Sequence, residues 1–191
     1  MDDIVIAALK KWPHVPAVCG WLGLDARGDW YLRDAAAQAA GAFTAGDPRA
    51  KGSRIEHAQL RAFIERNYER DPVSGAWFFQ NGPQRVFVEL EVAPWVLGLW
   101  RQGDGIAVST HTGLDFGAPR EVLLDEVGRL YLVSDLGLGL VRSTDMAVAA
   151  DAVEAGDWGP VVVDAAELPA RFSFCVSPLA SLPQSSGGSS G

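Results

Sequence analysis

Acidic and basic side chains meet in one short stretch of the chain, from Arg85 to Glu91. Alternate residues of an extended strand point to one side, so Glu89 and Glu91 are expected to share a face with Arg85. Two neighbouring carboxylates can have one pKa raised, which makes a general acid and base pair. A cross-strand ion pair on a solvated sheet face explains the same residues without catalysis and is the favoured interpretation.

A second candidate for chemistry is His111, in the string Ser109-Thr110-His111-Thr112-Gly113 at the end of an expected strand. Beside Asp115, a histidine there is suited to general base catalysis. A loop histidine without a chemical role is the simpler interpretation.

Metal and cofactor signatures are missing from the sequence. His14 lies too far from Cys19 for the tight zinc patterns, and no second Cys or His pair completes four ligands. The P-loop, dinucleotide, serine-elbow and zincin motifs are absent as well. We therefore expect no metal and no cofactor.

The richest group of aromatic and amide side chains surrounds Asn81-Gly82, a pair that strongly indicates a hairpin between alternating apolar runs. The expected strands are 76–80 and 84–93. We call residues 77–91 the polar-aromatic hairpin, because it carries more polar side chains than a turn requires. The candidate ligand-binding residues are this hairpin's Trp77, Gln80, Asn81, Gln84, Arg85, Glu89 and Glu91, together with His111.

One phrase occurs twice in the chain, at 24–32 and 124–132, and a looser copy with one extra residue lies at 71–79. Each copy places an Asp ahead of a Gly and an aromatic run. The Asp side chain can accept backbone N–H groups, and Gly takes the positive φ that closes the turn. These phrases predict hairpin turns rather than chemistry.

Two helices should pack on the hairpins. The first is expected over 54–69 and is opened by a capping box of Ser53 and Glu56. Its apolar stripe is formed by Leu60, Phe63, Ile64 and Tyr68. The second is expected over 145–154. Further helical elements are expected as a short helix at 3–11, a helical turn at 34–42 and a turn at 164–168. Further hairpins are expected to pair 18–24 with 29–33 and 96–100 with 106–110. A loop is expected at 44–52, a run broken by Gly137 and Gly139 at 136–141, a short buried strand at 161–163 and a last strand at 171–176.

This pattern predicts an α+β fold, in which antiparallel hairpins form one or two sheets with two main packed helices. The expected organisation is one compact domain over 1–180, with halves at 1–94 and 95–180 as an alternative, and a flexible Ser/Gly-rich tail over 181–191. The order of hairpin then helix at 18–69 and 122–154 suggests a degenerate internal repeat. Convergent turn chemistry explains the same order.

Charge and cysteine content restrict the partners and the compartment. The 191 residues carry a net charge of −8, which disfavours nucleic-acid binding. The apolar stretch Ile4–Leu9 is too short to span a membrane and has the reverse of a signal peptide's charge order. Two cysteines suit a reducing compartment, so we expect a cytoplasmic protein; a single Cys19–Cys175 disulfide remains open.

The strings at 12–28, 63–68 and 75–91 resemble an uncharacterised family of proteobacterial proteins, known only as a domain of unknown function. The resemblance extends from about Trp12 to Pro178, and its most specific part is Trp77-Phe78-Phe79-Gln80-Asn81-Gly82-Pro83-Gln84-Arg85. It implies a bacterial domain and transfers no activity.

Two functions follow from these residues. The first is a non-catalytic binding or accessory module that holds an unidentified protein or small-molecule ligand at the polar-aromatic hairpin. The alternative is a small hydrolase-like enzyme that uses His111, Asp115 and the pair Glu89 and Glu91. A pocket that brings these groups together with Arg85 and Asn81 would favour the enzyme.

Overall fold

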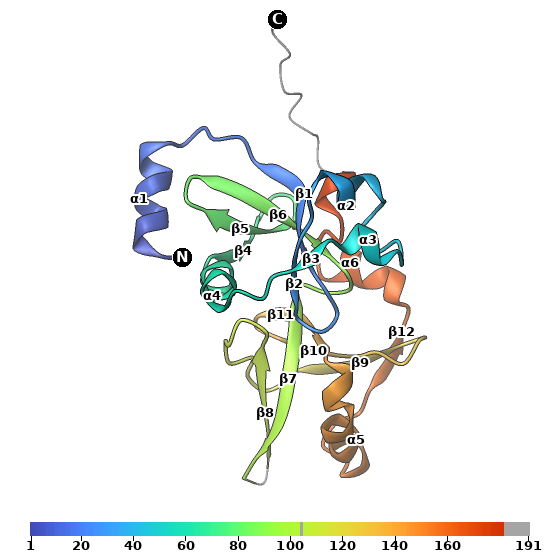
Figure 1. Cartoon of the computed structure of the whole chain (residues 1–191). Coiled ribbons are helices and arrows are strands. Elements are labelled where there is room, and N and C mark those ends of the chain that lie inside the picture. The colour runs from blue at the N-terminus through green and yellow to red at the C-terminus, as the bar shows by residue number, and fades with distance from the viewer. Residues whose placement is uncertain (104, 182–191) are drawn as a thin grey trace, which may run out of the picture. The chain divides into compact units, whose positions relative to one another are not determined.

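The structure is a computed structural model that describes residues 1–103 and 105–181, so most of the predicted tail lies outside the described residues. The chain forms two compact units. Unit 1 comprises 1–24, 30–91 and the C-terminal part from Cys175, and unit 2 comprises 25–29 and 92–174 (Figure 1).

Unit 1 is a mixed six-stranded sheet in the order β3-β2-β1-β6-β5-β4. Its strands are β1 (Val18–Leu24), β2 (Trp30–Leu32), β3 (Ser53–Arg54), β4 (Tyr68–Arg70), β5 (Trp77–Asn81) and β6 (Gln84–Leu90). Its helices are α1 (Asp3–Lys11), α2 (Ala35–Ala39), α3 (Pro48–Lys51), α4 (Ala58–Arg66) and α7 (Pro178–Ser181). Helix α4 contacts β5, and α7 contacts β1 and β6.

Unit 2 contains the second six-stranded sheet, in the order β12-β9-β10-β11-β7-β8. Its strands are β7 (Trp95–Gln102), β8 (Gly105–Thr110), β9 (Glu121–Asp125), β10 (Leu130–Ser134), β11 (Gly137–Val141) and β12 (Val161–Val163). Helices α5 (Met146–Glu154) and α6 (Leu168–Arg171) complete it, with 3-10 turns at Ser143–Asp145 and Ala165–Glu167. The predicted α+β class is thus confirmed, and both sheets combine antiparallel hairpins with parallel pairs.

The two sheets share one connectivity. In unit 1 the hairpin β1–β2 precedes the meander β4–β5–β6, and β6 pairs in parallel with β1. In unit 2 the hairpin β7–β8 precedes the meander β9–β10–β11, and β11 pairs in parallel with β7. The repeated unit is therefore a hairpin followed by a meander, rather than the hairpin followed by a helix that the sequence suggested.

The repeated phrases form the turns predicted for them. The Asp25 carboxylate accepts the N–H groups of Arg27 and Asp29, both at 2.9 Å. Asp125 accepts those of Val127 and Arg129 in the same way, at 3.1 and 2.8 Å. Gly28 and Gly128 have φ of 86° and 82°. The two turns nevertheless occupy different places in the repeated connectivity. Asp25 lies in the β1–β2 hairpin, whereas Asp125 lies in the first turn of the β9–β10–β11 meander. In the β4–β5–β6 meander that position is taken by the looser Asp71 turn.

The expected helix 54–69 is shorter than predicted, and its capping box does not form. Ser53 and Arg54 pair with β2 as the edge strand β3, so they are unavailable to start a helix. His57 is the N-cap instead, and its Nδ1 accepts the N–H of Leu60 at 3.3 Å. Asn67 ends α4, and Tyr68 begins β4.

Four other local predictions were wrong. The loop at 44–52 contains α3, which Asp47 caps through the N–H of Arg49. Gly139 does not break the run 136–141, because β11 passes beneath Leu97, whose side chain would lie 2.6 Å from a Cβ at that glycine. Strand β12 is largely exposed rather than buried. Residues 171–176 hold the end of α6 and a single bridge from Cys175 to Ala76 instead of a strand.

No helix in the described ranges 1–103 and 105–181 has the length and apolar character needed to span a membrane.

Candidate functional site

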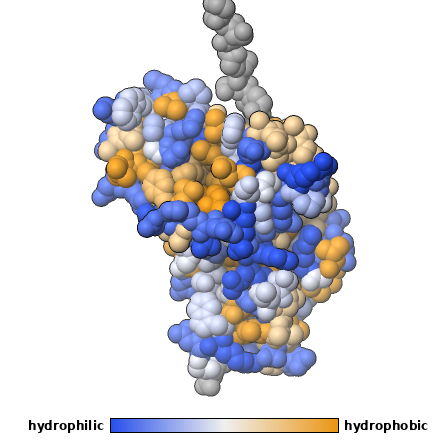
Figure 2. Space-filling model, viewed as in Figure 1, coloured by the Kyte–Doolittle hydropathy of each residue, from blue (hydrophilic) through white to orange (hydrophobic). Residues whose placement is uncertain are grey.

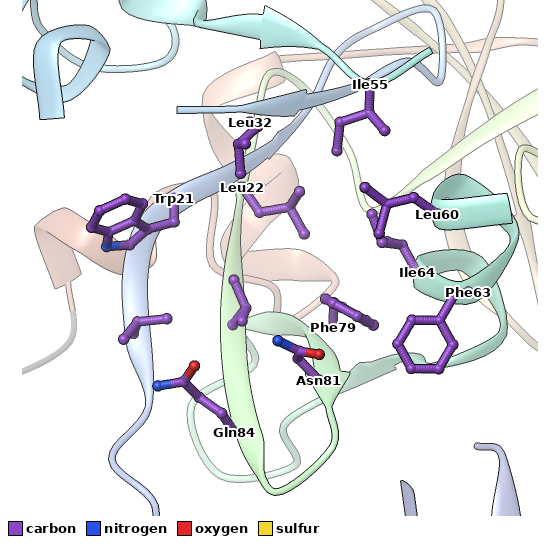
Figure 3. A pocket seen from close by; sticks show the side chains of 12 residues that line it. Trp21, Leu22, Leu32, Ile55, Leu60, Phe63, Ile64, Phe79, Asn81 and Gln84 are labelled. Carbon is purple, nitrogen blue, oxygen red and sulfur yellow. The ribbon is translucent and has the colours of Figure 1, made fainter. Parts of the chain in front are cut away.

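An apolar groove with a volume of about 510 Å³ lies on one face of the unit 1 sheet (Figure 3). Figure 2 shows apolar side chains gathered on this unit between α4 and β1. The groove is lined by side chains of four strands, of α4 and of the segment before it: Val18, Trp21, Leu22, Leu32, Ile55, Leu60, Phe63, Ile64, Phe79, Asn81, Gln84 and Val86. Its surface is therefore built from elements far apart in the sequence.

The floor of the groove follows from the pairing of β1 with β6. Leu22 pairs with Val88 and Val18 with Val86, with a bulge between them at Gly20, whose φ is +81°. On the next strand Phe79 pairs with Val86, so the apolar side chains of three strands continue one another. Alternation along each strand places these residues on one face.

Helix α4 forms the opposite wall but leaves the groove open. Its stripe Leu60, Phe63 and Ile64 faces the groove, and the Phe63 ring meets the Phe79 ring edge-on at 5.4 Å. The helix is nine residues long and contacts β5, so it does not cover β1 and β2. Trp21, Leu32 and Leu60 consequently remain 44%, 53% and 43% exposed at the rim.

One end of the groove is polar and uncharged. Asn81 and Gln84 are paired across the end of the β5–β6 hairpin, and both side chains line the groove. The Gln84 Nε2 donates to the carbonyl oxygen of Pro16 at 3.1 Å, which ties this end to the segment ahead of β1. The Gln84 carbonyl oxygen and the exposed Asn81 amide are thus placed to meet a ligand.

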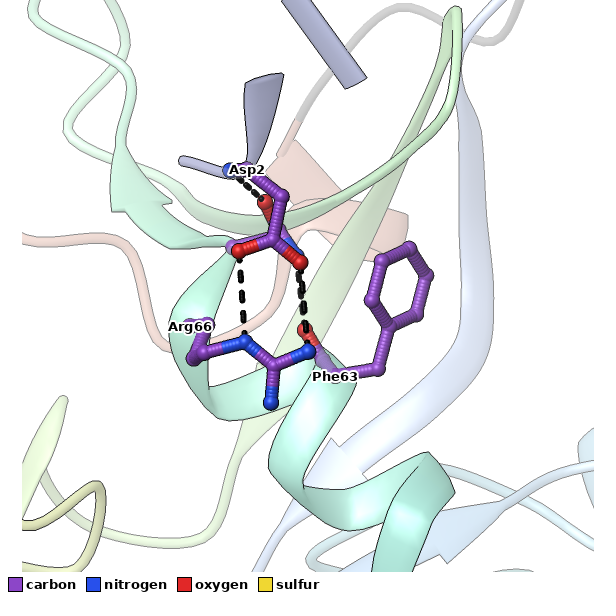
Figure 4. Close-up of polar contacts among 4 residues, drawn as sticks. Asp2, Phe63 and Arg66 are labelled. Carbon is purple, nitrogen blue, oxygen red and sulfur yellow. Dashed lines mark hydrogen bonds and ion pairs between the residues drawn. The ribbon is translucent and has the colours of Figure 1, made fainter. Parts of the chain in front are cut away.

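The C-terminal end of α4 is held by the N-terminus of the chain (Figure 4). The Asp2 carboxylate accepts two hydrogen bonds from Arg66, both at 3.2 Å, which hold its pKa below the usual value. The buried Asn67 accepts the Asp2 N–H at 2.8 Å and donates to the Phe63 carbonyl at 2.9 Å. These bonds support the groove wall at Phe63.

Two predicted ligand residues of the polar-aromatic hairpin are buried inside unit 1. The Trp77 ring lies 4.8 Å from the Tyr68 ring. Gln80 is 1% exposed, and its Nε2 donates to the Gly82 carbonyl at 2.9 Å. In this structure both residues support the hairpin, whereas the neighbouring Asn81 and Gln84 face the groove.

Arg85 is occupied by groups outside the groove. Its guanidinium donates to Asp71 at 3.3 Å and lies 4.6 Å from the Phe78 ring centre. Hydrogen bonds from Ser74, together with Arg85, hold the pKa of Asp71 below its usual value. The ion pair thus joins β6 to the β4–β5 turn.

The two glutamates have separate structural partners. Glu89 is 2% exposed and accepts the Ser177 hydroxyl at 2.5 Å and the Leu179 N–H at 2.9 Å. Glu91 pairs with Lys51 at 3.0 Å. The predicted cross-strand ion pair of Arg85 with these glutamates is therefore wrong, because Arg85 pairs with Asp71 and Glu91 pairs with Lys51 of α3. The Glu89 face is buried rather than solvated. The structure does not bring the two carboxylates together as an acid and base pair.

His111 and Asp115 belong to unit 2. The His111 Nδ1 accepts the Val96 N–H at 3.3 Å, and burial lowers its pKa from 6.5 to about 3. A histidine with that pKa is a weak base near neutral pH. Asp115 is exposed and accepts the Gly117 N–H at 3.0 Å.

Among the described residues, no group of three or more His, Cys, Asp or Glu side chains is arranged to hold a metal ion. Sequence reasoning missed the groove residues Trp21, Leu32 and Phe79. The sequence feature that pointed to this groove is the apolar stripe of α4, which is also what a helix packed on a core would show. No local sequence feature indicates that α4 covers only part of the sheet face on which it lies.

Comparison with known proteins gives a family but no activity. The protein-family model DUF2944, whose description reads "Protein of unknown function (DUF2946)", matches residues 1–179. No curated protein matches the chain. A crystal structure of a DUF1285 family protein from Silicibacter pomeroyi DSS-3 is similar with a TM-score of 0.47 and 14% identity, over 79% of this chain and 84% of that one.

Proposed function

The chain belongs to the DUF2944 family of proteins of unknown function, and we propose that it is a non-catalytic binding module whose ligand site is the apolar groove of unit 1. The observation that carries the proposal is the group of half-exposed apolar side chains at its rim, Trp21, Leu32 and Leu60. Exposed apolar side chains that line one concave surface are typical of binding sites. The proposed site includes Asn81 and Gln84 of the polar-aromatic hairpin.

The composition of the groove favours binding over catalysis. Its described lining consists of apolar residues with Asn81 and Gln84, and none of these side chains titrates near neutral pH. A hydrolase of the kind considered above needs a nucleophile or a general base within reach of its substrate. The groove supplies neither among its described lining residues.

We further propose a bacterial cytoplasm as the setting. The chain has only two cysteines, Cys19 and Cys175, too few for a disulfide framework, which suits a reducing compartment. Alkylation of the thiols in a fresh bacterial extract, followed by mass spectrometry, should label both of them. An oxidised pair in that extract would contradict the cytoplasmic setting.

The groove is tested with the uncharged dye Nile red, titrated while its fluorescence is followed. Trp21→Ala and Leu60→Ala should each weaken binding about tenfold, because each removes apolar contact area at the rim. Val73→Ala is the matched control, since Val73 is 92% exposed in the β4–β5 turn and lies outside the groove. Circular dichroism confirms that the variants fold.

Equal affinity of all three variants would show that the dye does not enter the groove. The proposed binding site would then be wrong.

A further inference from the structure

Resting on the proposed binding function, we infer that the groove takes an uncharged amphipathic small molecule. Its apolar body lies along the sheet between Trp21 and Phe63, and its neutral hydrogen-bonding head meets Asn81 and Gln84. The alternatives are a ligand with an ionised head and a polypeptide partner.

The absence of charge in the groove selects against an ionised head. None of the twelve described lining residues is charged. Moving an ionised group from water into such surroundings costs several kcal/mol unless an opposite charge meets it. Three nearby cations pair with carboxylates and do not line the groove: Arg85 with Asp71, Lys51 with Glu91 and Arg66 with Asp2.

The two amides define what the head must offer. An amide side chain presents both a donor and an acceptor. The Gln84 Nε2 already donates to the Pro16 carbonyl oxygen, which leaves the side-chain oxygen of Gln84, Oε1, to accept a hydrogen bond from a ligand. The Asn81 amide adds a donor and an acceptor at the same end of the groove. A hydroxyl or an unionised amide, which donates and accepts at once, matches this pair.

The size and floor of the groove favour a small molecule over a polypeptide. A volume of about 510 Å³ is within the range of small-molecule sites. An extended peptide binds by adding a strand at a sheet edge, where backbone groups are free. The groove floor is instead the face of β1 and β6, whose backbones pair with each other. Two amides leave most of an extended peptide's backbone without partners.

The experiment compares three ligands that share a ten-carbon alkyl chain and differ only in the head: 1-decanol, undecanoate and decylammonium. Each displaces Nile red from the full-length protein at pH 7, below the concentration at which it aggregates. We expect 1-decanol to bind about tenfold more tightly than either ion. The chain is constant, so the difference reports the head alone.

Variants at the polar end of the groove test whether the head of the ligand lies beside Asn81. Asn81→Asp should shift the preference toward decylammonium, because it adds a negative charge beside the head. Asn81→Leu should weaken 1-decanol binding without helping either ion. Val73→Asp is the matched control, since it adds the same charge at an exposed position outside the groove and should leave the order unchanged.

Each result decides between the claims. Equal affinities, tighter binding of an ion, or an Asn81→Asp variant that behaves like Val73→Asp would overturn the inference and leave the groove as a binding site. If a short amphipathic Leu/Lys helical peptide displaces Nile red better than 1-decanol, the groove takes a polypeptide and the inference is wrong. If Nile red itself does not bind, the proposed function fails as well.

Discussion

Glu89 and Arg33 are charged residues that unit 1 buries for structural reasons. Arg33 is fully buried and donates to the carbonyls of Ala50 and Gly41 at 2.7 and 2.6 Å. Burial lowers the pKa of Arg33, and the charge of Glu89 opposes that shift. A buried charge stays ionised only when partners replace its water, and here backbone groups supply them. Glu89 was a catalytic candidate in the sequence because burial cannot be seen there.

His111 should make the protein less stable as the pH falls. Its folded pKa of about 3 lies below the ordinary 6.5, so below pH 6.5 the unfolded chain binds a proton that the folded chain does not. Stability is therefore lost progressively as the pH falls from 6.5 toward 3. The expected loss attributable to His111 is about 2 kcal/mol at most between pH 7 and pH 5. Urea denaturation at the two pH values measures it.

His111→Asn is the control for this effect, because the Asn oxygen can still accept the Val96 N–H while the side chain does not titrate. The variant should lose less stability than the wild type over the same pH interval. The same loss in both proteins would show that His111 is not the group responsible.

At the scale of elements, the Asp turns hold the hairpins through their backbone hydrogen bonds. The Asp125 carboxylate accepts the Tyr131 hydroxyl at 2.8 Å as well as two N–H groups. Burial, with the hydrogen bond to Asp125, raises the pKa of Tyr131. The Asp125 turn is thus held both by its own backbone and by a side chain of β10.

Asp125→Ala should therefore destabilise the protein by about 2–4 kcal/mol, because it leaves a buried hydroxyl and two backbone N–H groups without their acceptor. Thermal or urea denaturation measures the loss. Adding Tyr131→Phe to Asp125→Ala should restore part of that loss, because it removes the orphaned hydroxyl. No recovery in the double variant would contradict this account.

Helix α4 decides where the groove lies. Its apolar stripe was visible from the three- and four-residue spacing of Leu60, Phe63 and Ile64. The pairing of Ser53 and Arg54 with β2 delays its start to Ala58, and Asn67 ends it nine residues later. A helix that short covers part of one sheet face, which leaves the remainder open to a ligand.

At the scale of the whole molecule, both ends of the chain contribute to unit 1. Val176 accepts the Leu90 N–H at 2.9 Å, and Ser177 and Leu179 donate to Glu89. Cys175 and Cys19 pack against one cluster of Ala76, Phe78 and Phe87. The C-terminal segment from Cys175 therefore supplies the hydrogen-bond donors of the buried Glu89 and packs on the rings of Phe78 and Phe87.

A chain ending at Phe174 should be clearly less stable than a chain ending at Ser181. Removing residues 175–181 leaves Glu89 buried without hydrogen-bond donors, for which a cost of about 3–5 kcal/mol is expected. Comparing these two truncated chains by urea denaturation isolates the segment, since both lack residues 182–191. Glu89→Gln in the shorter chain should recover stability. Equal stability of the two chains would show that the segment is not needed.

The sequence by itself determined the local structure wherever neighbouring residues set the geometry. The hairpins, the Asp and Gly turns, the helix at 145–154 and the family all followed from side chains a few residues apart. The α+β class followed from their order. Turn closure and strand alternation depend on backbone angles and short hydrogen bonds, which local residue types fix.

Only the tertiary structure decided which candidate residues face the groove. Asn81 and Gln80 are neighbours in the sequence, yet one lines the groove and the other bonds the Gly82 carbonyl. Glu89 became a structural anchor because a segment almost ninety residues later packs on it. Parallel pairing of β1 with β6 and the short reach of α4 create the groove. These are long-range contacts, set by packing of the whole unit rather than by any stretch of sequence.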